Sequence, residues 1–226
     1  MIIKTQELLL ENIDGKIAAW IGDSMTDTPD LARTIDSVVA GNVHTVSVPV
    51  SLNRRIWPWV EHKNIQIFNR IDFTPGEDID DAVSGFARDV MSAFKTGASG
   101  VQVCVQCREL ENFTNAIAPI RDDLFFEHHF SVGINIDERG GIDWEHIFDV
   151  IGRAHINSVL IIAHGDSFDA KSDFVGRVYD MLGHWNINAD LHLMFDKNMM
   201  RVTQVVRLVQ KMRPELMKNL RVFVNF

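Results

Sequence analysis

Acidic side chains recur in this chain at the points where apolar runs of residues end. The five acids are Asp23, Asp72, Asp137, Asp166 and Asp196, and His164 lies close to the fourth. If the runs are parallel strands, their ends meet at one edge of the sheet and these side chains share a site. Such a group transfers protons by acid–base chemistry or binds a divalent cation such as Mg²⁺ or Mn²⁺; which metal, if any, stays unknown. Each Asp can instead cap the helix that follows its strand.

Within this set we expect two kinds of role. The expected proton-transferring, catalytic groups are Asp137, His164, Asp166 and Asp196. The expected substrate-binding groups are Arg70, Gln106, Asn135, Lys197, Asn225, Asp23 and Asp72. The two cations would bind a carboxylate, a phosphate or a developing oxyanion, and the amides would orient hydroxyl groups. Lys197 could also form a Schiff base, which requires a buried amine of lowered pKa, or it could simply be exposed.

The elements that position these residues follow a repeating order. Eight apolar, strand-like runs are separated by loops and helical patterns; they span residues 16–23, 43–50, 65–72, 100–107, 130–137, 157–166, 189–196 and 221–226. Helix start signals follow several runs, among them Thr28-Pro29-Asp30, Pro75-Gly76-Glu77-Asp78 and Asp143. The segment 51–63 is the weakest helix candidate because Pro58 interrupts it.

Eight strands alternating with helices predict an α/β fold, a single-domain (β/α)₈ barrel of the TIM type over residues 1–226. The sequence given ends at the eighth strand, so we expect the helical pattern of residues 5–13 to cover the seam between strands eight and one. An open, doubly wound sheet is the alternative architecture.

Five of the runs alternate polar and apolar residues, so that one face of each strand is polar. In the third run the polar face carries Gln66, Arg70 and Asp72, and similar faces follow in runs four, five, seven and eight. In a barrel wrapped by helices the outward face must be apolar, so the polar faces point inward. We expect the upper polar residues to form a site and the lower ones, Gln66, Gln102, His192 and Arg221, to form a structural network.

The segment "IGDSMTD" (residues 21–27) resembles the first block of the SGNH (GDSL) hydrolases, in which the serine, here Ser24, is the nucleophile. That family also has a Gly-x-Asn-Asp block and a C-terminal Asp-x-x-His block. Here "GINID" (133–137) departs from the former, and the one Asp-x-x-His, at Asp143, lies in mid-chain. The longer stretch from Ile21 also resembles the fourth motif of haloacid-dehalogenase-like phosphatases, whose upstream Asp-x-Asp is missing here. A strand that enters a helix through a polar turn is the remaining interpretation.

Two shorter features favour structural roles. Cys104 and Cys107 spell Cys-x-x-Cys, but residues three apart on a strand face opposite ways, which disfavours a metal or redox pair. His128 and His129 precede the fifth run at the lower end of the barrel, where we expect them to face solvent or cap an element.

The composition indicates which kinds of binding partner and which cell compartment to expect. The net charge of −9 makes this an acidic protein and disfavours nucleic-acid binding, and no apolar run is long enough to span a membrane. The N-terminus lacks a signal-peptide pattern and two cysteines do not form a disulfide framework, so we expect a cytoplasmic protein. A homo-oligomer is compatible with these features.

These features together predict an enzyme of small-molecule metabolism. We expect a lyase/aldolase or isomerase that acts on a small polar or anionic substrate by acid–base chemistry at the carboxyl-end mouth of the barrel. One alternative is a hydrolase that uses Ser24 or a metal-activated water. The other is a non-catalytic barrel whose polar interior is purely structural.

Overall fold

The computed structural model describes residues 13, 15–22, 28–75, 78–125, 128–135, 142–162, 173–195 and 199–225. Within these ranges eight parallel strands close into a barrel, in which each strand pairs with the next along the chain and the last pairs with the first. They are β1 (Ile17–Trp20), β2 (Thr45–Pro49), β3 (Gln66–Asp72), β4 (Gly100–Val105), β5 (His129–Asn135), β6 (Ser158–Ile162), β7 (Asp190–Phe195) and β8 (Arg221–Asn225).

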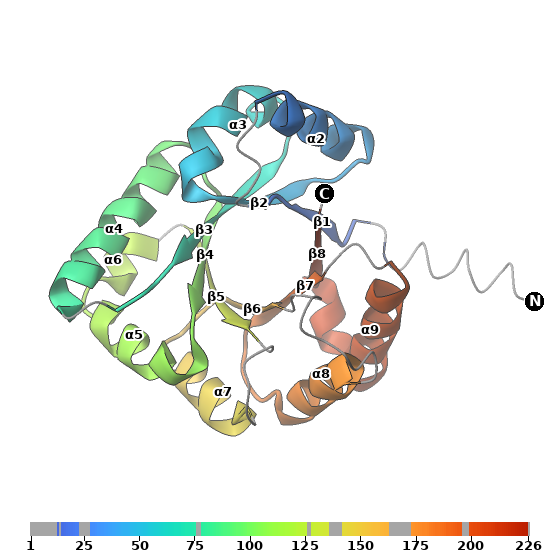
Figure 1. Cartoon of the computed structure of the whole chain (residues 1–226). Coiled ribbons are helices and arrows are strands. Elements are labelled where there is room, and N and C mark those ends of the chain that lie inside the picture. The colour runs from blue at the N-terminus through green and yellow to red at the C-terminus, as the bar shows by residue number, and fades with distance from the viewer. Residues whose placement is uncertain are drawn as a thin grey trace, which may run out of the picture.

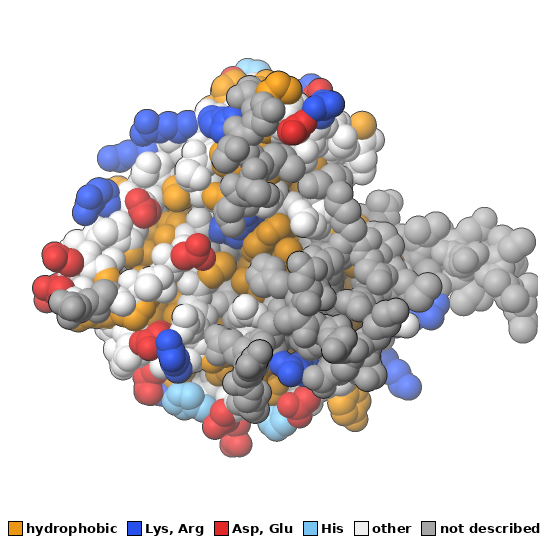
Figure 2. All heavy atoms as spheres, viewed as in Figure 1, with side chains coloured by type: hydrophobic (Ala, Val, Ile, Leu, Met, Phe, Trp, Pro, Cys, Tyr) orange, Lys and Arg blue, Asp and Glu red, His pale blue; other side chains and the backbone are white. Residues whose placement is uncertain are grey.

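Helices surround the strands on the outside of the barrel (Figure 1). They are α2 (Thr28–Ala40), α3 (Asn53–Val60), α4 (Ile79–Lys95), α5 (Leu110–Ile117), α6 (Arg121–Phe125), α7 (Trp144–Arg153), α8 (Asp173–His184) and α9 (Met199–Met212), with short 3₁₀ turns at Val50–Leu52, Cys107–Glu109 and Pro214–Lys218. Acidic and basic side chains lie around the periphery of the face in Figure 2, over this helical layer. Among the residues that the structure describes, no helix combines the length and apolar character needed to cross a membrane.

The predicted (β/α)₈ barrel is confirmed, and the open sheet is excluded because β8 pairs with β1 from Ile17 to Trp20. Each of the eight predicted apolar runs coincides with one of the observed strands, and only β5 extends beyond its run, by one residue at its start. The helix expected over residues 5–13 to cover the seam lies outside the described residues except for Ile13, which is buried.

The outward faces of the strands pack against the helices in two apolar clusters. In one, Val46, Val48 and Ile67 of β2 and β3 contact residues of α2 and α3 such as Ile35 and Ile56. The larger cluster joins the outward valines and leucines of the other strands to α4, α5 and α7–α9. Since burying apolar surface is the main favourable term in folding, these outward rows hold each helix against the barrel.

The inward faces carry most of the buried polar side chains, as the alternation predicted. They include Ser47, Arg70, Gln102, Ser131, Ser158 and His192. A smaller apolar cluster inside the barrel joins Trp20, Leu160, Ile162, Met194 and Phe223. The interior is therefore divided between polar and apolar side chains.

Side-chain caps begin two of the helices as expected. Asp78 accepts hydrogen bonds from the backbone N–H groups of Asp80 and Asp81 and starts α4, three residues after Pro75. Asp143 accepts one from the N–H of His146 and starts α7. The interrupted segment does form a helix: α3 is only eight residues long and retains Pro58 within it.

A close contact beyond the C-terminus of α4 gives the first prediction. Gly97 has a φ of +88°, and a Cβ atom there would lie 2.2 Å from the ring of Trp57. We expect Gly97→Ala to lower the free energy of unfolding by at least about 2 kcal/mol, because it combines backbone strain with overlap. Gly85→Ala is the control: its Cβ would meet no atom within 4 Å inside α4, so urea denaturation should show it unchanged or stabilised. Equal effects of the two substitutions would contradict this account.

Candidate active site

A hollow of about 1150 Å³ lies at the carboxyl ends of the strands from β1 to β6. Its lining combines an aromatic ring, charged groups, amides and a thiol; among them are Trp20, Arg70, Asp72, Cys104, Gln106 and Asn135. In barrels of this type the carboxyl ends of the strands carry the active site. Its place at the strand ends makes this hollow the candidate site of the described chain.

Arg70 is the most firmly held charged residue of the hollow. Its Nη1 donates to the backbone oxygen of Ser47 at 3.0 Å and to the Oγ of Ser47 at 3.1 Å, and its Nη2 donates to the backbone oxygen of Ile21. The guanidinium carbon lies 3.9 Å from the centroid of the Trp20 ring, a cation–π contact. These contacts fix the position of the guanidinium at the wall of the hollow.

The stagger of the strands brings these groups together. Arg70 on β3 is in register with Pro49 of β2 and Gln102 of β4, while Ser47 is in register with Trp20 of β1. The arginine side chain therefore reaches across β2 to the end of β1. Only 7% of the residue is exposed although it lines the hollow, so the guanidinium is largely shielded from bulk water.

A small and mostly apolar wall lies opposite the polar side of the hollow. Gly133 of β5 lies between Cys104 and Ile162, where an added Cβ would come within 3.3 Å of the Cys104 sulfur and 3.0 Å of the Ile162 Cδ1. The glycine thus widens the mouth at this point. The thiol of Cys104 is only partly buried and faces the hollow.

Four of the expected binding residues lie in or near this hollow. Arg70, Asp72, Gln106 and Asn135 line it, with Asp72 and Gln106 exposed and Asn135 partly buried. Asn225 ends β8 and is in register with Trp20, but it does not line the hollow. The polar ends of β3, β4 and β5 therefore lie along one hollow.

The remaining expected site residues lie outside the described residues. These are Asp23, Ser24, Asp137, His164, Asp166, Asp196 and Lys197. Their roles, including the Schiff-base alternative for Lys197, therefore stay predictions. Among the residues that the structure does describe, no group of three or more His, Cys, Asp or Glu side chains is arranged to hold a metal ion.

The lower end of the barrel contains a second polar group, as expected, but with different members. Arg221 donates to the Oγ1 of Thr45 and to the Oε1 of Gln66, both at 3.0 Å. Gln102, expected in this network, instead accepts a hydrogen bond from Ser47 beside Arg70. The polar network of the barrel thus splits in two, and Gln102 belongs to the part under the mouth.

His192 differs from the expected network as well. It is fully buried, and neither ring nitrogen has a hydrogen-bond partner among the described residues. Its ring lies edge-on to Phe68 and Phe223, with centroids 5.9 and 5.8 Å away. Burial, then the positive charge of Arg221 and the neighbouring His129, lowers the pKa of His192 to about 3, so the ring is neutral at pH 7.

The expectation for His128 and His129 is wrong in part. His129 is the first residue of β5, partly buried, with its ring 6.3 Å from that of His192. Burial, and less strongly Arg221, lowers the pKa of His129, while Asp190 opposes the shift. His128 stacks on Phe94 at 3.7 Å. The alternation of β5 begins one residue earlier than the sequence indicated, and this places His129 inside.

The two cysteines of the Cys-x-x-Cys segment lie in different surroundings. Cys104 faces the interior cluster, whereas Cys107 packs against the outer one beyond the end of β4. The two sulfurs therefore face opposite sides of the strand layer.

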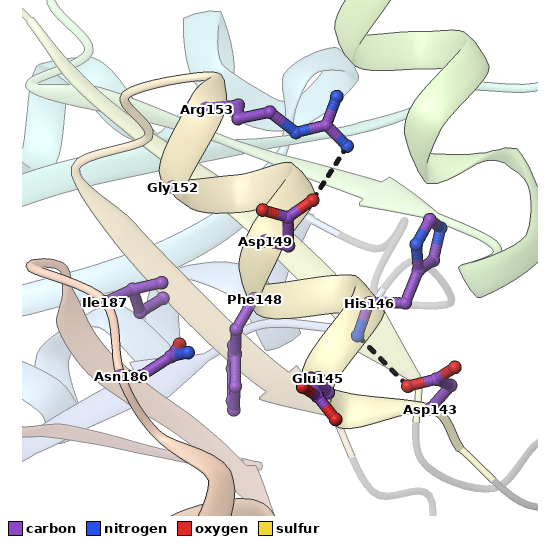
Figure 3. A pocket seen from close by; sticks show the side chains of 9 residues that line it. All are labelled: Asp143, Glu145, His146, Phe148, Asp149, Gly152, Arg153, Asn186 and Ile187. Atoms are coloured by element: carbon purple, nitrogen blue, oxygen red, sulfur yellow. Dashed lines mark hydrogen bonds and ion pairs between the residues drawn. The ribbon is translucent and has the colours of Figure 1, made fainter.

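A further hollow lies on the outer side of α7 and was not expected from the sequence (Figure 3). Three of its charged residues have roles in helix structure: Asp143 caps α7, and Arg153 pairs with Asp149 at 3.0 Å. A surface ion pair and a cap explain these residues without a ligand. The hollow at the barrel mouth remains the better candidate.

The sequence did not single out Trp20, Cys104 and Gly133, which line the hollow, or Ser47, which holds Arg70. For Ser47 the signal was present, because Thr45, Ser47 and Pro49 alternate with Val46 and Val48 in the second run. The residues around Trp20 are apolar on both faces, so no alternation marks its direction.

Comparisons with known proteins agree with the fold. No family model and no curated protein matches the sequence. Among solved structures, a proposed deoxyribose-phosphate aldolase from Toxoplasma gondii ME49 is similar, with a TM-score of 0.76, 13% identity and coverage of 98% of this chain and 93% of the other. The tetrameric deoxyribose phosphate aldolase of Aeropyrum pernix has a TM-score of 0.63 and 10% identity, and the match covers 97% of this chain and 92% of the aldolase. A D-psicose 3-epimerase, solved with D-fructose, has a TM-score of 0.62 and 10% identity, and the match covers 93% of this chain and 84% of the epimerase. At these identities the likeness establishes the barrel fold alone.

Proposed function

We propose that this chain is an enzyme of the lyase/aldolase or isomerase type that acts on a small anionic metabolite in the hollow at the barrel mouth. The observation that carries the proposal is the guanidinium of Arg70, which Ser47, the Ile21 oxygen and the Trp20 ring hold at the wall of that hollow. A buried cation of fixed geometry favours a carboxylate, a phosphate or an oxyanion that develops during reaction.

The neighbouring groups have complementary roles in this proposal. Asp72, Gln106 and Asn135 would bind hydroxyl or carbonyl groups of the substrate from the polar side of the hollow. Asp137, His164, Asp166 and Asp196 would move protons, Lys197 would bind the anionic end, and Asp23 and Asn225 would lie at the rim. Cleaving a carbon–carbon bond beside a carbonyl and shifting a carbonyl both pass through an enolate, so both need an acid–base pair and an oxyanion partner.

The fold neighbours support this class by analogy only, because one fold hosts many reactions. Two of them are named as deoxyribose-phosphate aldolases and one as an epimerase, and one of the aldolases is a tetramer. A phosphorylated sugar or a similar hydroxy-carbonyl compound is accordingly the substrate class that we propose, with a homo-oligomer as the expected assembly.

The test looks for proton abstraction in D₂O. The full chain is incubated with a panel of small phosphorylated or carboxylated aldehydes and ketones, and ¹H NMR follows both loss of the C–H signal beside the carbonyl and the appearance of products. We expect exchange or turnover with at least one compound, and a large loss of it in His164→Ala. The same reactions with a chelator show whether a divalent cation takes part. Phosphate binding without exchange on any compound would favour a non-catalytic barrel, and no binding of any anion would refute the proposal.

A further inference from the structure

The Ser47 hydroxyl connects the mouth of the barrel to a fully buried amide beneath it. Ser47 Oγ accepts from Arg70 Nη1 at 3.1 Å and donates to Gln102 Oε1 at 2.5 Å. A serine hydroxyl has a single proton, so donation to Gln102 leaves its lone pairs available to the guanidinium. Ser47 and Gln102 have no measurable exposure and neither lines the hollow.

Gln102 occupies a fully buried position, where an apolar side chain would cost less free energy to bury. Its Nε2 has no hydrogen-bond partner among the described residues, although the side chain is completely buried. An unpaired buried amide nitrogen costs free energy, so packing alone does not explain a glutamine here. Its Oε1 does have a defined task, which is to fix the direction of the Ser47 O–H bond.

We infer that Ser47 and Gln102 are positioning residues, which lock the guanidinium of Arg70 in the orientation that presents it to the anion. This inference rests on the proposed function of Arg70 as the anion-binding group. The backbone oxygens of Ser47 and Ile21 set where the guanidinium lies, and the oriented hydroxyl limits its rotation about the Nε–Cζ bond. A rotationally fixed fork binds a phosphate or carboxylate with less loss of entropy than a mobile one.

The chain offers a matched control for removing the Ser47 hydroxyl. Ser131 on β5 also faces the barrel interior, is equally buried, and hydrogen-bonds Ser158 rather than Arg70. Ser47→Ala and Ser131→Ala each remove one buried hydroxyl from the barrel interior, so a general effect on stability should be similar in both. A difference between them in anion binding therefore reports on Arg70.

The experiment measures two quantities on the full chain: the rotation rate of the Arg70 guanidinium by ¹⁵N NMR exchange, and the affinity for inorganic phosphate by calorimetry. We expect Ser47→Ala to raise the rotation rate at least tenfold and weaken phosphate binding roughly tenfold, while Ser131→Ala leaves both as in the wild type. Gln102→Leu, which keeps Ser47 but removes the acceptor of its proton, should shift both quantities in the same direction.

The possible outcomes separate the two proposals. An unchanged rotation rate in both Ser47→Ala and Gln102→Leu would overturn the positioning role, whatever phosphate does. Faster rotation with unchanged phosphate affinity would also overturn it, provided that Arg70→Met abolishes binding. If phosphate does not bind the wild type, or binds Arg70→Met equally well, the proposed anion site fails, whereas the rotation rates still decide whether Ser47 and Gln102 hold the guanidinium.

Discussion

Replacing Arg70 by methionine should weaken binding of the anionic substrate, and of phosphate as its simplest substitute, by at least about 100-fold. Methionine can occupy part of the same space but donates no hydrogen bond and carries no charge. The loss of affinity is expected from removing a buried cation that lines the hollow and lies against Trp20. Calorimetric titration of wild type and variant measures it directly.

The control for this substitution is Arg221→Met. Arg221 is also a partly buried arginine inside the barrel, with two side-chain hydrogen bonds, but it lies at the opposite end from the hollow. Both variants should lose some stability, since both leave buried acceptors unpaired. Anion affinity should fall in Arg70→Met alone; an equal fall in Arg221→Met would show that the effect comes from folding and would remove the support for the site.

Acidification should destabilise the protein through His192. Its ring is neutral in the folded state down to about pH 3, whereas the unfolded chain takes up a proton near the ordinary value of 6.5. Between these values the unfolded state binds more protons, so the free energy of unfolding falls as the pH falls, by about 1.4 kcal/mol per pH unit from this residue. His129 shifts in the same direction and adds to the slope, while Asp190 opposes its shift.

The substitution His192→Phe tests this contribution. A phenyl ring has no titrating group and suits a site between Phe68 and Phe223, so the dependence of stability on pH between 7 and 4 should become less steep by roughly 1 kcal/mol per pH unit. Urea denaturation at several pH values gives the slope. His62→Phe is the control, because the side chain of His62 is 87% exposed. Parallel curves for wild type and His192→Phe would contradict the prediction.

The barrel was predictable from the sequence because two independent patterns indicate it: the alternation of polar and apolar residues within strands, and the order of strands and helices along the chain. Regular alternation in β3, β4, β5, β7 and β8 shows which face meets the helices, and the order of strands and helices then requires parallel pairing. Strand ends differed from the predicted runs by a few residues, since a run of apolar residues does not mark where hydrogen bonding to the neighbour stops. The shift at the start of β5 was enough to move His129 inside.

The sequence predicts which face of its own strand a site residue occupies, but not which residues of other strands it contacts. Arg70, Asp72, Gln106 and Asn135 were expected at the mouth and line the hollow there. What the sequence did not reveal is which groups meet across strands: the contacts of Arg70 with Trp20, Ser47 and the Ile21 oxygen depend on the stagger between β1, β2 and β3. Alternation within one strand contains no information about stagger, so the partners of the arginine had to come from the structure.

The phenylalanines inside the barrel divide its polar interior into a lower and an upper part. On β3, Phe68 separates Gln66 from Arg70, and on β8, Phe223 separates Arg221 from Asn225. The hydrogen bonds described for Arg221 reach Thr45 and Gln66, whereas those of Ser47 reach Arg70 and Gln102, so the two groups share none of these partners. A substitution in one group can therefore be accommodated without rearranging the other, and the two ends of the barrel can change independently in evolution.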